Sequence, residues 1–351
     1  MPIGRGAKVT EQKIRVRLDS EDDYLHPLEA AENFNESMYF NVFDRQRKLG
    51  AWFRMANRPN EGRGEMTCCI YLPDGRIGFM FARPQRRDND AMDGGGMKFE
   101  VIEPFKQLTV TYRGKLCLLA DPQQMAQPAT AFKNNPIVDA AIDLTFDGIS
   151  PMFGGEAVNA DGSQIEQDAG QSFARGHTEQ HTRGTGTIRI GTESFTIDGL
   201  GLRDHSWGPR YWQAIYWYRW LPMNFSEDFA LMVSITCRPG EEPRAGGMVL
   251  RDGEYVMIRR AKIETKYDDN QCQETFEVWA ETDEREYQIG GRVMSLIPLR
   301  NRRRTPEGED LLTRITEGMT EYRCDGLVGY GLSEYLDQVV DGVPVGMKAG
   351  H

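Results

Sequence analysis

The densest group of chemically active side chains in this 351-residue chain lies in residues 199–212, which read GLGLRDHSWGPRYW. The stretch holds an aspartate, a histidine, two arginines and two tryptophans, although the whole chain has only five histidines and six tryptophans. A histidine such as His205 takes or gives a proton near neutral pH. Asp204 would orient its ring, and Trp207 offers a large apolar wall with one N–H donor. The stretch therefore predicts a site for proton transfer.

Two arginines flank this group. Because a guanidinium presents paired donors to a carboxylate, either Arg203 or Arg210 could hold an anionic group of a ligand. A structural alternative is an ion pair between Arg203 and Asp204 that locks a corner of a barrel. Gly199 and Gly201 would permit a bulge or bend there, so that side chains of the segment converge on one cavity.

A second polar cluster precedes this stretch, in the sequence HTEQH. In an extended strand His177, Glu179 and His181 project from one face. Burial would raise the pKa of a carboxyl such as Glu179, which makes it a candidate acid next to His205. A metal-dependent hydrolase using the two histidines is an alternative, although three ligands on one strand would span about 13 Å, too far for a single ion. A solvated polar face is the third reading.

An aromatic strand follows, with the sequence YWYRW at residues 216–220. Alternation places Tyr216, Tyr218 and Trp220 on one face of it. One face closes the core and the other could line a cleft for a bulky apolar ligand, with Trp207 as a further wall. Later in the chain, GLSEYL places Glu334 in a strand-like run, as a second candidate buried carboxylate.

Two common kinds of site are not indicated. The chain has no G-x-S-x-G elbow, and Ser206 directly follows His205, where adjacent side chains diverge. The glycine-rich GLVGYG at residues 326–331 lacks the helix that a dinucleotide-binding loop requires. We therefore expect no cofactor and no metal.

The elements that must position these residues are predominantly β-strands. Short runs rich in Val, Ile, Phe, Tyr and Thr alternate with turn residues along most of the chain, which predicts an all-β sandwich or barrel architecture. A short helix is expected over residues 20–33. A polar, glycine-bearing segment near residues 147–175 is either a long active-site loop or the boundary between two domains, 1–160 and 161–351.

Composition restricts the partners. The formal net charge is −11 and the pI is near 5.1, which disfavours nucleic acid and anionic membranes. No apolar run suggests a signal peptide or a membrane insertion, so a cytoplasmic location is expected. The six cysteines lie in strand-like contexts and are interpreted as reduced core residues. Monomer and homodimer both remain open.

The stretch GLGLRDHSWGPR, preceded by HTEQH and followed by the aromatic strand, resembles the carotenoid 1,2-hydratase/AttH-like superfamily. Three further segments, NESMYFNVFD, AWFRMANRPNEG and YLPDGRIGF, are similar to a largely uncharacterised bacterial branch of it. The resemblance covers most of residues 35–336. It implies two lipocalin-like (calycin-like) antiparallel β domains, an N-terminal sandwich and a C-terminal barrel, with the ligand between them and no redox cofactor.

By position, His205 and Trp207 match the His-x-Trp element of the hydratases in this superfamily. Their catalytic acid is an aspartate in a Tyr-x-Asp element somewhat downstream, and here the chain departs from the pattern. The corresponding region reads MNFSEDFALM, with Glu227 and Asp228 but no Tyr-x-Asp. A literal match occurs at residues 267–269, in a polar hairpin-like segment.

Together these observations predict a cofactor-independent acid–base lyase acting on a hydrophobic aromatic or isoprenoid-like small molecule. The reaction would be hydration, dehydration, ether-ring opening, or elimination with decarboxylation. His205 and Glu179 would handle protons, with Asp204 orienting His205. One alternative is a non-catalytic carrier of an apolar ligand, and another is an isomerase or cyclase on the same scaffold.

Overall fold

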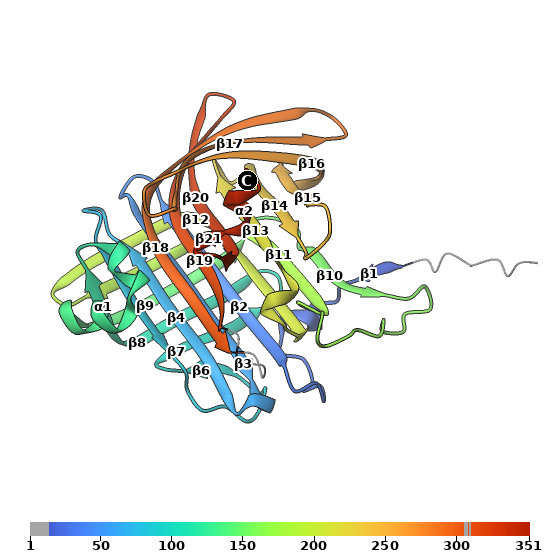
Figure 1. The fold of residues 1–351 in the computed structure, drawn as a ribbon, viewed down its shortest axis with the longest axis horizontal. Coiled ribbons are helices and arrows are strands. Elements are labelled where there is room, and N and C mark those ends of the chain that lie inside the picture. Colours follow the sequence, from blue (N-terminus) through green and yellow to red (C-terminus); the bar gives the residue numbers. More distant parts are fainter. Residues whose placement is uncertain (1–13, 305–307, 309) are drawn as a thin grey trace, which may run out of the picture.

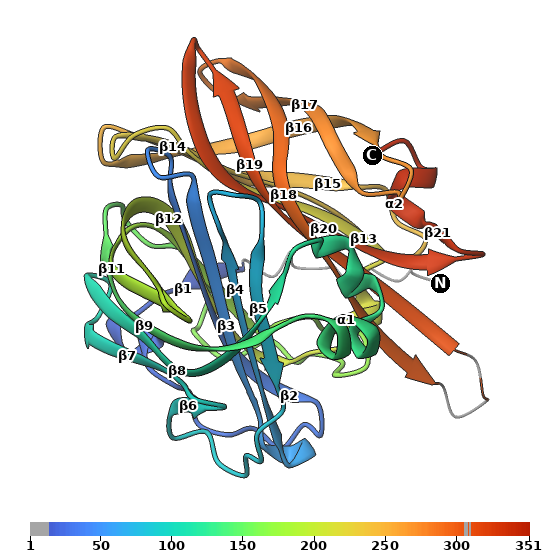
Figure 2. The ribbon, with the colours of Figure 1, turned by 90° about the vertical axis from the view of Figure 1, so that its left-hand side faces the viewer.

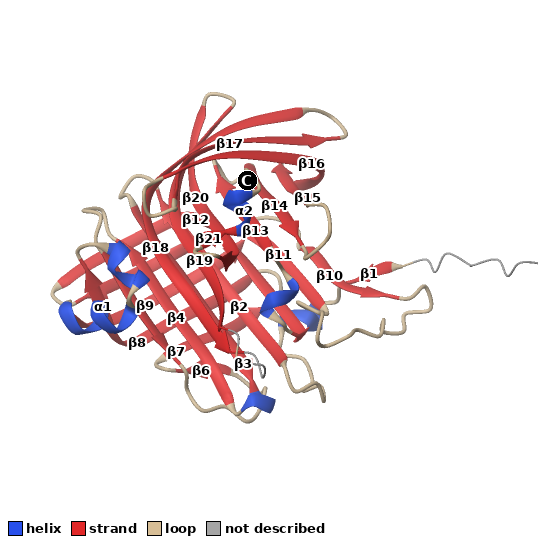
Figure 3. Ribbon diagram, viewed as in Figure 1, coloured by secondary structure: helices blue, strands red, loops and turns tan. Residues whose placement is uncertain are grey.

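The computed structural model describes residues 14–351 except 305–307 and 309. Nearly all of the regular structure is antiparallel β-sheet, shown in red in Figure 3. Within the described residues the strands form two large sheets. The predicted all-β class with two lipocalin-like domains and little helix is confirmed.

The first sheet has twelve strands within the described part of the chain. They are β1 (Arg15–Arg17), β2 (Phe34–Asp44), β3 (Leu49–Arg58), β4 (Arg63–Tyr71), β5 (Ile77–Ala82), β6 (Met92–Gly94), β7 (Met97–Glu103), β8 (Gln107–Leu119), β9 (Ile137–Gly148), β10 (Phe153–Val158), β11 (Gly176–Ile190) and β12 (Glu193–Pro209). Its main path runs β1-β10-β11-β12-β2-β3-β4-β5-β8-β7-β6. Strand β9 pairs with both β8 and β11, so the sheet curls back onto itself.

The second sheet has nine strands among the described residues. They are β13 (Trp217–Asn224), β14 (Phe229–Cys237), β15 (Arg244–Arg251), β16 (Glu254–Tyr267), β17 (Gln273–Thr282), β18 (Glu286–Arg304), β19 (Asp310–Cys324), β20 (Leu327–Val340) and β21 (Val343–Pro344). Each strand pairs with the next, and β13 also pairs with β20. This last pairing closes the C-terminal barrel.

Helical segments are short. They are η1 (Ser20–Asp23), η2 (Pro59–Glu61), η3 (Pro122–Ala126), α1 (Pro128–Asn134), η4 (Trp212–Ala214) and α2 (Val345–Lys348). In the described part of the chain, no helix has the length and apolar character needed to cross a membrane.

The predicted N-terminal helix is confined to one 3-10 turn, Ser20–Asp23. The rest of the predicted segment has no helical structure. Pro27 lies in its middle, and a proline inside a helix removes a backbone donor and clashes with the preceding turn. The expected helix is therefore wrong beyond its first turn.

The boundary between the two sheets also differs from the predicted position after residue 160. Strands β11 and β12 pair with β9, β10 and β2 of the first sheet, and the second sheet begins at Trp217. The polar segment between β10 and β11 is thus a connection within the first sheet. Composition marked this segment as either a domain boundary or a long loop, and it could not reveal which strands the segment joins.

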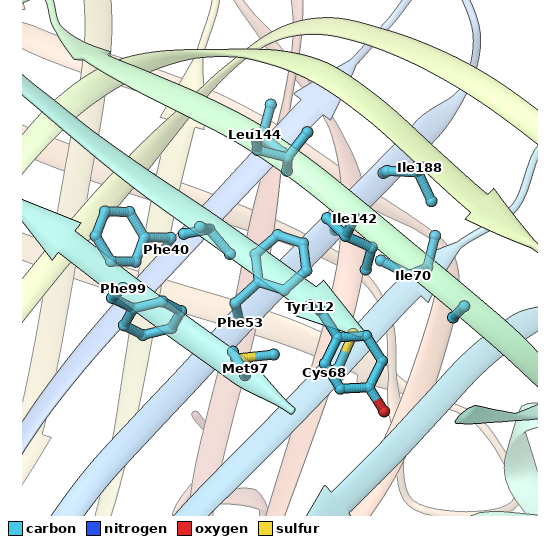
Figure 4. Packing of buried hydrophobic residues seen from close by; sticks show 14 of the residues in the cluster. Phe40, Phe53, Cys68, Ile70, Met97, Phe99, Tyr112, Ile142, Leu144 and Ile188 are labelled. Carbon is cyan, nitrogen blue, oxygen red and sulfur yellow. The ribbon is translucent and has the colours of Figure 1, made fainter. Parts of the chain in front are cut away.

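Each sheet encloses its own apolar core. In the first, alternate residues of the strands point inward, and Figure 4 shows Phe40, Phe53 and Ile142 among the packed side chains. A second cluster fills the C-terminal barrel, with Trp217, Leu221 and Tyr335 among its members. All six cysteines are buried, as predicted.

A third apolar cluster joins the two sheets. It combines outward-facing residues of the first sheet, such as Trp52 and Tyr71, with Ile297, Met319 and Leu332 of the second. Figure 2 shows the two halves side by side, the blue-to-green sheet against the orange-to-red one. The site described below lies along this junction.

Candidate functional site between the two sheets

A cavity of about 610 Å³ lies between the outer faces of the two sheets. Its walls mix aromatic rings with charged and hydroxyl groups. The lining includes Ser37, Tyr39, Trp52, Arg54, Phe79, Phe81, Phe173, His177, Asp204, Ser206, Arg210, Trp212, Tyr218, Trp220, Glu317 and Glu334. A cavity of this size, mostly apolar with a few converging polar groups, is typical of a small-molecule site.

Strand β12 divides the predicted residues between two environments. Side chains alternate across a strand, so Asp204 and Ser206 face the cavity while His205 points the other way, into the interior of the first sheet. The strand runs without a register shift from Glu193 to Pro209. The expected bulge is absent from the pairing of this described strand with β11, so its side chains alternate instead of all converging on one cavity.

Asp204 contacts a different histidine from the one expected. Its Oδ2 lies 3.1 Å from Nε2 of His177 on the neighbouring strand β11. Desolvation lowers the pKa of His177, but the hydrogen bond to Asp204 and the charge of Glu179 outweigh it, so the pKa is raised. The pair is a group on the first-sheet wall of the cavity that can bind and release a proton.

Two carboxyls lie together on the opposite wall. Glu317 on β19 and Glu334 on β20 are direct cross-strand partners, and the hydroxyl of Tyr218 donates to Glu334. Burial raises the pKa of both carboxyls, and the charge of Glu334 raises that of Glu317 further. Two carboxyls in contact away from water cannot both ionise easily, so the pair holds a proton at neutral pH.

A third carboxyl lies behind the aromatic wall. Glu179 is buried, and its Oε1 accepts a 2.6 Å hydrogen bond from the indole of Trp220. Its Oε2 has no partner among the described residues. Burial raises the pKa of Glu179 to about 6, against the lowering effects of His177 and of the Trp220 hydrogen bond. Glu179 is buried and its pKa is raised, but it is not among the residues that line the cavity and His205 is not its neighbour.

The aromatic strand β13 alternates as the sequence indicated. Tyr218 and Trp220 line the cavity, whereas Trp217 lies in the core of the C-terminal barrel. Tyr216 precedes the strand and packs against that same barrel core rather than lining the cavity.

Arg210 lines the cavity with little exposure. One of its terminal nitrogens donates to Ser206 at 2.7 Å, and its guanidinium lies 4.3 Å from the centre of the Phe173 ring. Burial lowers the pKa of Arg210 to about 10, and the charge of Arg54 contributes to this shift. The group nevertheless stays charged at neutral pH.

His205 belongs to a buried network inside the first sheet. Its Nε2 lies 2.8 Å from Oε1 of Glu36, and the same oxygen lies 2.7 Å from Nδ1 of His26. Trp207 stacks on His26 with ring centres 4.0 Å apart. Burial alone would raise the pKa of Glu36, but the hydrogen bonds from the two histidines lower it to about 2. Neither His205 nor Trp207 lines the cavity.

Two more predicted residues also lie away from the cavity. Arg203 forms a buried ion pair with Asp23, at 2.5 and 3.1 Å, instead of pairing with Asp204 or facing a ligand. His181 is fully buried, with Nδ1 3.1 Å from the hydroxyl of Tyr255. Burial lowers the pKa of His181 to about 4.

The histidines of HTEQH are not gathered for metal binding. Among the described residues, the group with ligand atoms close enough to share an ion is His26, Glu36 and His205. Every oxygen of Glu36 in this group already accepts hydrogen bonds, including one from Asn89 and two from the backbone N–H of His26. The arrangement fits a hydrogen-bonded structural network.

Sequence reasoning missed Arg54, Glu317, His26 and Glu36. A signal for Glu317 exists, because Ile315 and Met319 place it between apolar residues on one face of its strand. Glu36 has the same signal. The partners of these residues are remote in sequence, so the signal marks a buried charge without its role.

The fold is shared with several solved structures. An AttH protein from Nitrosomonas europaea aligns with 14% identity and a TM-score of 0.50, over 88% of this chain and 96% of its own. CghA in complex with Sch210972 aligns with 11% identity and a TM-score of 0.52, over 87% of this chain and 89% of its own. Kievitone hydratase from Nectria haematococca aligns with 8% identity and a TM-score of 0.51, over 89% of this chain and 93% of its own. At such low identities the likeness shows a shared fold and nothing more.

Sequence comparison places the chain more narrowly. Among curated proteins no match was found. A family model described as "Domain of unknown function (DUF7064)" matches residues 19–339. Since this match spans both sheets and both walls of the cavity, the protein belongs to the DUF7064 family.

Proposed function

We propose that this protein is an acid–base lyase that adds or removes water, or opens a C–O bond, in an apolar small molecule bound between the two sheets. The observation that carries the proposal is the Glu317–Glu334 pair on the cavity wall, with Tyr218 donating to Glu334. A carboxyl that stays protonated at neutral pH can act as a general acid.

The opposite wall supplies the complementary group. His177, with its ring held by Asp204, lines the same cavity from the first sheet. An unprotonated His177 can accept a proton while the carboxyl pair donates one, so a ligand between the walls would meet an acid and a base. Correctly placed acid–base groups contribute about 10²–10⁴-fold each to a rate.

The elimination direction illustrates the balance. His177 removes a proton from the carbon next to the C–O bond, and that C–H electron pair forms the new double bond. The C–O bond breaks with its electron pair on oxygen, which takes a proton from the carboxyl pair. Hydration is the reverse, with water as the source of the hydroxyl group. No electrons enter or leave, so the step needs no redox partner.

Roles for the other predicted residues follow from their positions. Asp204 orients His177 and not His205. Glu179 acts as a further proton reservoir behind Trp220, because its pKa of about 6 lies close to neutrality. His205, Trp207 and the ion pair of Arg203 keep the first sheet folded behind the site. The resemblance to hydratases in fold supports this class of reaction, and the kievitone hydratase structure is one such neighbour.

The test is a turnover screen. Wild type, E334Q and E317Q would be incubated in D₂O with aromatic and isoprenoid alkenes, alcohols and cyclic ethers, and products would be detected by mass spectrometry. We expect wild type to convert at least one compound, and each variant to lose about 100-fold or more. E277Q, an exposed carboxyl on β17 of the same barrel, is the matched control and should keep full activity.

A carrier would behave differently. The aromatic lining would still bind an apolar ligand, but wild type and E334Q would both leave it unchanged after prolonged incubation. A compound isomerised or cyclised without exchange of water would instead identify the isomerase alternative. Either result contradicts the lyase proposal.

A further inference from the structure

We infer that the cavity contains an anion-binding subsite, formed by Arg210 and Arg54, and that the natural ligand is an apolar, ring-containing acid whose carboxylate lies there. The inference rests on the proposed function only in taking this cavity as the substrate site. It adds the chemical class of the substrate, which the acid–base groups do not specify.

Arg210 is the first observation. It is 8% exposed, and none of the described residues offers it a carboxylate within ion-pair distance. Its one side-chain hydrogen bond goes to the neutral hydroxyl of Ser206, and its Nε has no partner in the described part of the chain. A buried charge without a counter-ion is costly and is normally paired. The missing partner is supplied by a ligand.

Arg54 is the second observation that supports an anion-binding subsite. Its Nη1 donates to Glu65 at 2.9 Å, whereas its buried Nη2 has no partner among the described residues. Trp212 lies against both arginines, 5.4 Å from the guanidinium of Arg210 and 5.8 Å from that of Arg54. All three residues line the cavity. Two unsatisfied N–H donors therefore flank one indole at the same end of the site.

The surrounding charges leave this end positive. Arg54, Arg58 and Arg63 share the two carboxylates of Glu61 and Glu65, so Arg210 adds a fourth cation to a cluster already in excess. The carboxylate whose charge acts on Arg210 is Asp204, which is hydrogen-bonded to His177. An incoming anion would offset the repulsion between the arginines.

The form of the donors favours a carboxylate. A guanidinium is a planar fork that matches two carboxylate oxygens, and Ser206 with its neighbour Ser37 adds hydroxyl donors at the same wall. The remaining lining, including Phe79, Phe81 and Trp52, is aromatic and suits a ring. The ligand would thus have its acid group at the arginines and its ring across the cavity toward the carboxyl pair.

The test compares 2-naphthoate with 2-naphthamide, which have nearly the same shape but differ in charge. Binding would be measured at neutral pH by quenching of tryptophan fluorescence and by calorimetry. Wild type should bind the acid about 10-fold more tightly than the amide, since a hydrogen bond to a charged group is worth about 1.5–3 kcal/mol. R210Q and R54Q should each reduce this preference to about 2-fold or less, with the amide affinity unchanged.

The matched control is R238Q, because Arg238 also lines the cavity but is exposed. It should keep the full preference for the acid. If R210Q does not fold, R210K and R54Q still test the subsite, because lysine keeps the charge and loses the fork. Equal affinity of wild type for both compounds, or no binding of the acid at millimolar concentration, would overturn the inference.

None of these measurements uses turnover, so the two proposals fail separately. E334Q should bind 2-naphthoate with the same preference as wild type. A protein that prefers the acid but converts no substrate would retain the subsite and lose the lyase assignment. A protein that converts neutral substrates, with R210Q as active as wild type, would keep the lyase assignment and lose the anion-binding subsite.

Discussion

Glu317 and Glu334 stand directly opposite each other on β19 and β20, so a buried carboxyl and a half-buried one meet on the cavity wall. Tyr218 donates to one of them, and no cation among the described residues lies within ion-pair distance of either. Such an arrangement stabilises a proton rather than two negative charges. The stability of the folded protein therefore depends on whether the carboxyl pair is protonated.

This pair predicts a stability that decreases as pH rises. Burial raises the folded-state pKa of Glu334 above its ordinary value near 4.5, so its contribution is fully present below that value and is lost as pH rises through the raised pKa. E334Q removes the titration. Urea unfolding should show E334Q more stable relative to wild type at pH 8.5 than at pH 5, by roughly 2 kcal/mol.

The control for this experiment is E277Q, whose exposed carboxyl should give the same small difference at both pH values. If E334Q and wild type differ equally at pH 5 and pH 8.5, the carboxyl pair does not hold its proton in the folded protein.

The contact between Asp204 and His177 predicts a measurable pKa change. The hydrogen bond to Asp204 and the charge of Glu179 hold the pKa of His177 above its usual value. D204N removes one of these and should lower that pKa. Titration of the imidazole signals by NMR would follow it, with H177N used for assignment and His351 as an internal reference. An unchanged titration curve would mean that the two side chains are not in contact in solution.

The position of His205 predicts a structural role. H205A leaves Glu36 one donor short inside the first sheet and should reduce the free energy of unfolding by roughly 2–4 kcal/mol. H205Q can still donate an N–H to Glu36 and should recover much of this loss. Urea denaturation would measure both, and binding of 2-naphthoate by the folded variants should match wild type.

The pH range over which the hydrogen-bonded network around Glu36 stabilises the protein follows from opposite shifts in the pKa values of Glu36 and His26. Glu36 has a pKa lowered to about 2, so its contribution is present above its ordinary value and is lost as pH falls through 2. The pKa of His26 is raised by Glu36 and Asp22 against desolvation, so its contribution is lost as pH rises above its ordinary value of 6.5. Full stabilisation is expected between about pH 4.5 and 6.5.

If H205Q stayed stable but abolished turnover, His205 would have to be counted among the catalytic residues again.

The close packing of Trp207 predicts a severe effect at a glycine. The ring of Trp207 covers Gly176, and a Cβ there would lie 2.2 Å from its carbon atoms. G176A should therefore destabilise the protein by about 2 kcal/mol or more, because both elements are fixed strands. G246A is the control, since nothing lies within 4 Å of the added Cβ. Thermal unfolding of the two variants would compare them, and equal melting temperatures would contradict the packing.

The sequence by itself determined the class of fold and the acidic and aromatic character of the site. Alternation along the strands and the turn residues between them predicted an all-β architecture, and the family resemblance implied its two β domains. Alternation also separated Tyr218 and Trp220 from Trp217. These are local properties, because the period of two along a strand is set by the backbone. The same alternation marked Glu179, which is buried, and Glu334, which is half-buried, as candidate carboxyls of the site.

Only the tertiary structure decided which of these side chains meet. Asp204 and His205 are neighbours in the chain, yet they face opposite sides of β12, and each binds a partner supplied by another strand. The pairing of β12 with β2 and β11, and of β19 with β20, depends on contacts remote in sequence. A single sequence does not contain the register of those pairings, so it could name the acids and bases but not assemble them into a site.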